Sequence, residues 1–307
     1  MRDALMKSLF MLAEKNSNLM LLTGDLGYGV FEEFEKKYPS QYLNVGVAEQ
    51  NMMGIAAGLA SEGFKVITST FAPFQTMRCC EQIKVNLGYM RHKVCMVGLA
   101  SGVVLGMLGY THCSIEDVAV MRSIPGITVI SPADCVETVK VALAAVNHHE
   151  SVYIRLTGGA RNPQVYREDY SYEIGKANTL REGNDITIIA AGTMVYVSLE
   201  AADILLEQGI SATVVNMHTI KPIDTSMIEK ACESSKLIVT VEEHSTIGGL
   251  GSAVAEYKAT LKNTPSQFFI GLPDNHGKAG EYKDLLEKHG LTAIQIAKGI
   301  VNQYERV

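Results

Sequence analysis

The stretch LNVGVAEQNM, residues 43–52, joins a short strand-like run to a helical pattern, so it predicts a strand that leads directly into a helix. A single acidic residue, Glu49, stands in this junction among apolar and small side chains. A carboxyl group in such surroundings is partly desolvated, which favours its protonated form and lets it donate a hydrogen bond. The simpler alternative is a first-turn acid that satisfies free helix amides and the positive end of the helix dipole.

On both sides of this junction, short apolar runs alternate with longer helical patterns, which is typical of parallel βαβ units. The expected strands are 19–23, 65–69, 93–98, 127–130 and 152–156, then 186–191, 212–216, 237–242 and 267–270. The expected helices are 5–13, 48–61, 73–88, 114–124 and 134–147, then 195–208, 225–232, 251–261 and 292–304. Between the two sets lies a polar stretch with little periodicity, which indicates a linker. The sequence therefore predicts an α/β fold of two doubly wound domains, each with a mainly parallel sheet and helices on both faces. We place their bounds at 1–160 and 185–307, with a linker at 161–184.

Composition limits the classes of partner. The chain has 307 residues, enough for two domains, and a formal net charge of −6, which argues against nucleic acid or an anionic membrane surface. No apolar run reaches the roughly 20 residues that span a bilayer, and no signal-peptide pattern is present, so we expect a cytoplasmic protein. The six cysteines lack metal-ligand spacing, so we expect neither a zinc site nor disulfides.

The segment GVAEQN, residues 46–51, resembles the pyrimidine-domain signature of the transketolase family of thiamine diphosphate enzymes. The segments 216–222, 241–244 and 248–252 also resemble the C-terminal domain of that family, so the similarity spans nearly the whole chain. It implies that Glu49 bonds the aminopyrimidine ring of the cofactor. The cofactor would then react as a carbon ylid and as an electron sink.

The same resemblance implies further cofactor contacts. Phe71 and Phe74 match the family's ring-binding aromatics, and aromatic faces can stack on an aminopyrimidine. Met77 stands where many relatives carry Tyr and could still pack on the ring. Asp25 matches an acidic residue near the cofactor. The alternative for the two Phe is that they only fill the core.

His112 lies in a loop that we expect to feed a helix capped by Ser114. It resembles the family's active-site histidine, which contacts the donor oxygen and assists proton transfer. A structural histidine is the alternative. Arg2 matches a phosphate-contacting Arg of the family. Arg161 matches a second such Arg if the alignment is shifted by a few residues. Two other substrate positions have changed, to Leu108 and Ala100, which leaves a modified, nucleotide-linked or unphosphorylated sugar open.

A diphosphate needs a metal ion and hard oxygen ligands, and the chain has no Gly-Asp-Gly motif to supply them. Gly24-Asp25 followed by Asn51 imitates that motif, but its third residue is Leu26. The resemblance therefore implies the C-terminal subunit of a split transketolase, paired with a diphosphate-binding subunit that holds Mg²⁺, in an α2β2 assembly. We expect this pair to transfer a two-carbon ketol unit between sugars. The alternatives are a decarboxylating enzyme, similar to deoxyxylulose phosphate synthase or a 2-oxo acid dehydrogenase, and a scaffold subunit without catalysis.

The glycines 248, 249 and 251 could indicate a dinucleotide loop, but their spacing departs from G-x-G-x-x-G. The alternative is a helix start that needs small residues for close packing.

Overall fold

The computed structural model describes residues 1–26, 29–158 and 162–306. The first half of the chain contains α1 (Arg2–Lys15), β1 (Leu19–Thr23), α2 (Glu32–Lys37), η1 (Pro39–Gln41), β2 (Tyr42–Asn44), α3 (Glu49–Ser61), β3 (Lys65–Phe71), α4 (Ala72–Gln75), α5 (Cys80–Gln82), η2 (Ile83–Tyr89), β4 (Val94–Ser101), η3 (Gly106–Leu108), α6 (Asp117–Ser123), β5 (Ile127–Ile130), α7 (Cys135–Ala145) and β6 (Ser151–Thr157). The second half contains β7 (Asn178–Arg181), β8 (Ile186–Ala190), α8 (Met194–Glu207), β9 (Ala212–Asn216), β10 (Thr219–Lys221), α9 (Thr225–Ser234), β11 (Leu237–Ser245), α10 (Leu250–Lys258), β12 (Ser266–Leu272), α11 (Tyr282–Lys288) and α12 (Ala293–Tyr304).

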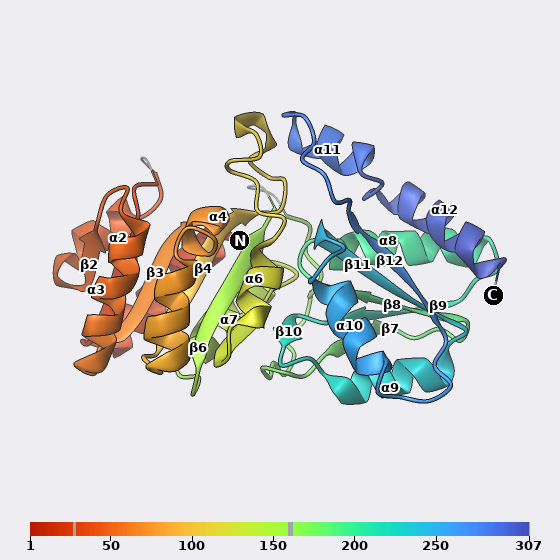
Figure 1. Ribbon diagram of the computed structural model, residues 1–307, viewed down its shortest axis with the longest axis horizontal. Helices are drawn as coiled ribbons and strands as arrows, with labels where there is room; N and C mark the ends of the chain where they lie inside the picture. Colours follow the sequence, from red (N-terminus) through yellow and green to blue (C-terminus); the bar gives the residue numbers. More distant parts are fainter. Residues whose placement is uncertain (27–28, 159–161, 307) are drawn as a thin grey trace.

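These strands form two sheets that lie side by side with helices around them (Figure 1). The first sheet has the order β10-β5-β6-β4-β3-β1-β2, and the second has the order β12-β11-β8-β9-β7. Within each sheet the strands pair in parallel, except that the edge strands β10 and β7 run antiparallel to their neighbours. The predicted α/β class with two mainly parallel sheets is confirmed.

Alternating side chains of the first sheet face two helical layers. Leu22 and Val66 share a cluster with α3, whereas Leu21 and Ile67 belong to a cluster formed with α1 and α7. Side chains on both faces of β1 and β3 are therefore buried, as in other parallel sheets that helices cover on both faces. This arrangement leaves the carboxyl edge of the sheet as the place where loops meet.

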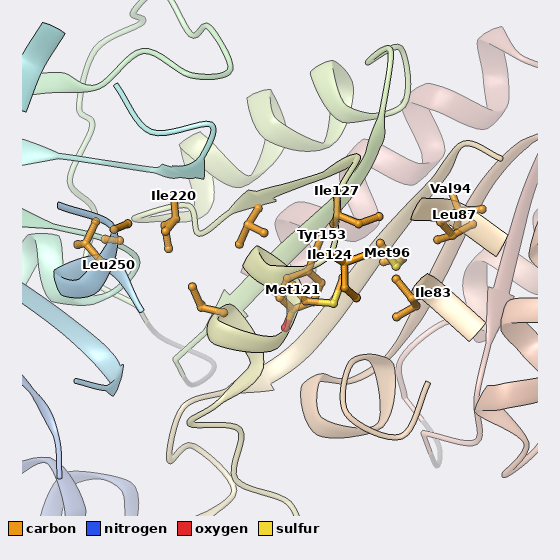
Figure 2. Packing of buried hydrophobic residues seen from close by; sticks show 14 of the residues in the cluster. Ile83, Leu87, Val94, Met96, Met121, Ile124, Ile127, Tyr153, Ile220 and Leu250 are labelled. Atoms are coloured by element: carbon orange, nitrogen blue, oxygen red, sulfur yellow. The ribbon is translucent and has the colours of Figure 1, made fainter. Parts of the chain in front are cut away.

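One apolar cluster continues from the first half into the second. It contains Met121 and Ile124 at α6, Ile220 in β10 and Leu250 in α10, all at most 3% exposed (Figure 2). Strand β10 also pairs with β5, although it lies in the second half of the sequence. The two halves therefore share a core and a sheet.

The structure differs from the expected elements in several places, and three of them bear on the site or on the connection between the halves. The helix expected at 73–88 is broken into α4, a turn at 76–79, α5 and the π-helical segment η2. The expected linker contains a strand, β7, that pairs with β9. Helix α6 begins at Asp117 with Glu116 as its N-cap, so the expected cap at Ser114 is wrong. Ser114 instead pairs through its backbone with Gly102.

Two helix caps hold the segment that connects the halves. Asp134 caps α7 by accepting from the Glu137 amide through Oδ1, and its Oδ2 accepts from the amides of Val165 and Tyr166 at 2.8 Å each. Asp224 caps α9 in the same way and accepts from the Ala177 amide at 2.9 Å. The connection is therefore anchored to one helix of each half.

Across the described ranges, every helix is too short or too polar to cross a bilayer. The cytoplasmic location expected from the sequence stays a prediction.

Candidate active site

Glu49 lies at the carboxyl edge of the first sheet, in the first turn of α3. Two hydrogen bonds shape the turn that precedes it: the Val45 amide donates to the Thr23 carbonyl at 2.9 Å, and the Asp25 amide donates to the Gly46 carbonyl at 3.2 Å. Gly46 has φ +73, a left-handed conformation that costs glycine nothing. The turn brings the Glu49 carboxyl group inward, where the residue is 3% exposed.

The Glu49 carboxylate has a cationic partner that the sequence analysis missed. Arg78 Nη1 donates to Glu49 Oε2 at 2.7 Å, a short hydrogen bond between a guanidinium and a carboxylate. The other carboxylate oxygen lies beside Gly24, where an added Cβ would be 3.4 Å from Oε1. The glycine therefore keeps open the space next to this carboxylate.

Two of the predicted aromatics and the predicted histidine meet next to this pair. The Phe74 and His112 ring centroids are 5.2 Å apart, and the Phe71 ring lies 6.2 Å from Phe74 and 6.3 Å from His112, all edge to face. The Arg78 guanidinium carbon lies 3.9 Å from the Phe74 ring centroid, so one face of that ring carries a flat cation. The structure thus brings Glu49, Phe71, Phe74 and His112 into one cluster.

His112 is held by the loop before α6. Gly109, with φ +79, lets the loop turn back so that the His112 amide donates to the Gly109 carbonyl at 3.0 Å. On the side chain, Nδ1 is 3.0 Å from Thr111 Oγ1. The imidazole is half-buried, so it can exchange protons with a bound molecule while its backbone stays fixed.

A cleft of about 360 Å³ adjoins the aromatic cluster through Phe71. Arg2, the first residue of α1, also lines it, and its guanidinium lies 3.6 Å from the Asp3 carboxylate. Ala100 lines the same cleft with φ +51, an uncommon conformation for a residue with a side chain. Because the Ala100 side chain is small, it leaves room in this part of the cleft.

The remaining predicted site residues are Asp25, Met77 and Arg161. Asp25 is exposed after β1, and its place near the cofactor stays a prediction. Met77 is 49% exposed in the turn at 76–79, and its role on the ring stays a prediction. Arg161 falls at a position outside the described residues, so its predicted substrate contact also stays a prediction.

Cys79, next to Arg78, does not add a nucleophile to this site. Burial, with a smaller effect of the Glu49 charge, raises the pKa of the Cys79 thiol to about 12. A thiol with that pKa stays neutral at physiological pH, and thiol nucleophiles act as thiolates. The site therefore offers a carboxylate, a histidine and aromatic faces.

These groups fit the aminopyrimidine half of thiamine diphosphate. The ring is flat and needs an acceptor, a stacking face and space beside the carboxylate, which Glu49, Phe74 and Gly24 provide. The buried Thr70 Oγ1, 3.0 Å from the Cβ position at Gly24, has no hydrogen-bond partner among the described residues. The cofactor's diphosphate half needs a cation site as well. In the described ranges, one group of acidic and histidine side chains, at residues 148–150, is close enough to share a cation. This group precedes β6, so it lies at the edge of the sheet opposite to Glu49.

The glycine-rich start of α10 is filled by the protein itself. The amides of Leu250 and Gly251 donate to the Glu242 carboxylate at 2.7 and 2.8 Å. A Cβ at Gly249 would overlap Glu242 Oε2, and one at Gly251 would overlap the Phe269 ring. The close-packing interpretation is confirmed, and the dinucleotide loop is excluded because a carboxylate already occupies its amides.

Comparisons with known proteins agree with this geometry. The family description "Transketolase, pyrimidine binding domain" matches residues 1–161, and "Transketolase, C-terminal domain" matches residues 175–296. The chain is 40% identical to an apulose-4-phosphate transketolase subunit of Phocaeicola vulgatus, over 97% of this chain and 95% of that protein. It is 38% identical to the 6-deoxy-6-sulfo-D-fructose transketolase subunit SqwH of Clostridium sp. (strain MSTE9), over 100% and 95% of the two chains. A split gene transketolase, solved as an inactive beta4 tetramer, has a TM-score of 0.88 and 36% identity, over 98% of this chain and 96% of that chain.

Proposed function

This chain belongs to the transketolase family, and on that premise we propose that it forms the pyrimidine-binding side of a thiamine diphosphate site. It is the C-terminal subunit of a split transketolase-type enzyme, a transferase that moves a two-carbon ketol unit between sugars. The observation that carries the proposal is the meeting of buried Glu49 with the Phe71, Phe74 and His112 rings at one sheet edge.

Each of these residues has a role that its surroundings support. Thiamine diphosphate, when bound, supplies the reactive carbon and the electron sink. Glu49 would exchange a proton with the pyrimidine ring, and Phe74 would hold the ring by stacking. His112, half-buried and close to both Phe rings, would bind the sugar oxygen and move its proton. Phe71 connects the ring site to the cleft.

The partner would hold the diphosphate and Mg²⁺. Hard oxygen ligands are needed for that ion, and the edge around Glu49 shows no such set among the described residues. The two relatives named above are described as transketolase subunits, and the solved relative is inactive as a beta4 tetramer. We therefore propose an α2β2 heterotetramer in carbohydrate metabolism, with this chain inactive on its own.

The substrate we propose is a ketose with an anionic group at the end far from its carbonyl. The cleft next to Phe71 is lined by the Arg2 guanidinium, with Asp3 beside it, and by apolar residues such as Leu99. Guanidinium groups recognise phosphate and related oxyanions. One of the relatives acts on a phosphorylated sugar and another on a sulfonated one, by their names.

The test starts from the tagged chain, recovered from its native lysate with thiamine diphosphate and Mg²⁺ present and measured by intact-complex mass spectrometry. We expect a second subunit and the mass of the cofactor. The complex should then transfer two carbons from a ketose phosphate or ketose sulfonate to an aldose phosphate.

Two outcomes would contradict this function. Carbon dioxide released from a 2-oxo acid, with no transfer between sugars, would indicate the decarboxylating alternative. A chain that assembles with itself alone and binds no cofactor would indicate a scaffold.

A further inference from the structure

Arg78 contacts both side chains that would hold the proposed cofactor ring. Its guanidinium donates to Glu49 at 2.7 Å and covers the Phe74 ring at 3.9 Å from the centroid. These are the same two partners, one acceptor and one aromatic face, that the aminopyrimidine needs. Because the guanidinium lies between Glu49 Oε2 and the Phe74 ring, a pyrimidine that bonds Glu49 and stacks on this face of Phe74 would have to displace it, whichever carboxylate oxygen it bonds.

The break in the expected helix 73–88 directs Arg78 to this place. Thr76 Oγ1 donates to the Ala72 carbonyl at 2.7 Å where α4 ends, and residues 76–79 form a turn. The Arg78 amide donates to the Pro73 carbonyl at 3.2 Å, and the Arg78 carbonyl accepts from Gln50 Nε2 at 3.0 Å. Because Gln50 follows Glu49, this last bond fixes the turn against the start of α3. The backbone of Arg78 is therefore held, while its side chain remains 38% exposed and can rotate outward.

We propose that Arg78 is a positioning residue that takes the place of the pyrimidine until the cofactor binds. The proposal rests on the proposed function, because it assumes that Glu49 and Phe74 hold the ring. In the structure Arg78 lies against a carboxylate that is 3% exposed, a charge that would otherwise be buried without a partner. The cofactor then enters by displacing the guanidinium from Glu49 and from the Phe74 face.

This exchange has a thermodynamic consequence. Contacts that stabilise the cofactor-free form, and that are lost on binding, weaken the apparent affinity for the cofactor. Removing the guanidinium should therefore tighten cofactor binding and destabilise the cofactor-free subunit. A residue that helped to hold the bound cofactor would have the opposite effect on affinity.

The experiment measures the Kd of thiamine diphosphate, with Mg²⁺ in excess, by calorimetric titration of the assembled complex after its cofactor has been removed. For Arg78→Gln we expect a Kd about tenfold lower than for the unchanged chain, from the loss of one partly exposed ion pair and one cation–π contact. Arg181→Gln is the matched control, because Arg181 forms an exposed pair with Asp203 far from this site. It should leave the Kd unchanged.

A second readout is the thermal midpoint. Without cofactor, Arg78→Gln should melt below the unchanged chain, and with saturating cofactor the two midpoints should converge. If Arg78→Gln does not fold, the same measurements are made on Arg78→Lys, because an ammonium keeps the charge but cannot lie flat on Phe74. It should tighten binding by a smaller factor.

A Kd that is unchanged or higher in the Arg78 variants, while the unchanged complex binds the cofactor, would overturn this inference and leave the proposed function intact. An unchanged complex that binds no thiamine diphosphate would overturn the proposed function, and this inference with it.

Discussion

Glu49 shows how one side chain can be understood only together with its neighbour. In the sequence Glu49 stands among apolar residues, and this predicted a carboxyl group that keeps its proton. In the structure a guanidinium lies 2.7 Å from this carboxyl group, a partner that the sequence pattern did not indicate. Its burial is tolerated because Arg78 neutralises the charge.

We predict that Glu49→Gln lowers ketol transfer by about 10²–10⁴-fold, the range typical for losing an acid–base group. The amide keeps the shape and can still accept from Arg78, so the fold should persist. Steady-state rates of the assembled complex and the thermal midpoint of the subunit check both parts. Full activity in this variant would remove Glu49 from the proposed mechanism.

Arg2 gives a prediction about substrate charge. Arg2→Gln should raise KM about tenfold or more for a ketose phosphate or sulfonate, because a charged hydrogen bond to an oxyanion is lost. For an uncharged ketose KM should barely change. Equal effects on charged and uncharged ketoses would exclude Arg2 as the anion contact.

The candidate site could be predicted from sequence where motif residues follow strands directly. Phe71 ends β3 and Glu49 starts α3 just after β2, so both reach the same sheet edge. Arg78 could not be predicted, because its position depends on a turn that interrupts a helical pattern. A lone cation beside Met77 in an apolar stretch was the available signal.

At the scale of elements, the composition and length of a segment determined whether its strand could be predicted from the sequence. Strands β1, β5 and β9 have the expected bounds, since runs of four or five buried residues, mostly apolar or β-branched, carry a clear pattern. Strands β7 and β10 are short and mostly polar and were missed, because such a segment shows no apolar period. Their strand geometry comes from pairing with neighbours, which is a tertiary effect.

The cap of α7 allows a prediction about the connecting segment. Asp134→Ala should lower the free energy of unfolding by about 2–4 kcal/mol, because it removes a helix cap and leaves two further backbone amides without their acceptor. Urea unfolding of the subunit measures this loss. Thr292→Ala, which removes only the cap of α12, should cost about 1 kcal/mol or less. Equal losses in the two variants would mean that the connection is not anchored through Asp134.

At the scale of the whole molecule, a buried arginine, Arg155, links the two halves. Arg155 Nε donates to Asp117 Oδ2 at 2.8 Å, and Arg155 Nη2 donates to the Ser114 and Glu243 carbonyls at 3.1 and 2.9 Å. Tyr153 also donates to Asp117, at 2.7 Å. Glu243 lies in β11, so the guanidinium connects the first sheet to the second.

We predict that Asp117→Asn costs about 3–5 kcal/mol in the free energy of unfolding, because it leaves the Arg155 charge buried without an anion. Asp203→Asn, in the exposed pair with Arg181, should cost about 0–1 kcal/mol. Denaturant unfolding of both variants gives the comparison. Losses of similar size would show that the buried pair is not important for stability.

Acid should also weaken the junction between the halves. Burial lowers the pKa of His218 and of His244 to about 4. The unfolded value is about 6.5, so the unfolded chain takes up these protons first as the pH falls. Their contribution to stability is complete above about pH 6.5 and is lost as the pH falls toward 4, by about 2 kcal/mol for each histidine at pH 5.

The measurement is the difference in urea stability between pH 7 and pH 5, compared between variants. Glu137 and Glu242, whose pKa burial raises to about 7, act in the opposite direction, so the comparison with the unchanged chain is what matters. His218→Asn should lose less stability on acidification than the unchanged chain. The exposed His276→Asn should behave as the unchanged chain does. If the His218 and His276 variants do not differ, the assignment is wrong.

Strand β10 has a consequence for anyone who recombines this subunit with a relative. It follows β7, β8 and β9 of the second sheet in sequence and precedes β11 and β12, yet it completes the edge of the first sheet. A crossover in the polar connection would give the first sheet an edge strand from the other parent. A crossover after Lys221 would divide the second sheet between parents instead. No single junction yields a chimaera in which each sheet comes from one parent. Exchange of whole sheets requires three crossovers: one in the connection before β7 and two that flank β10.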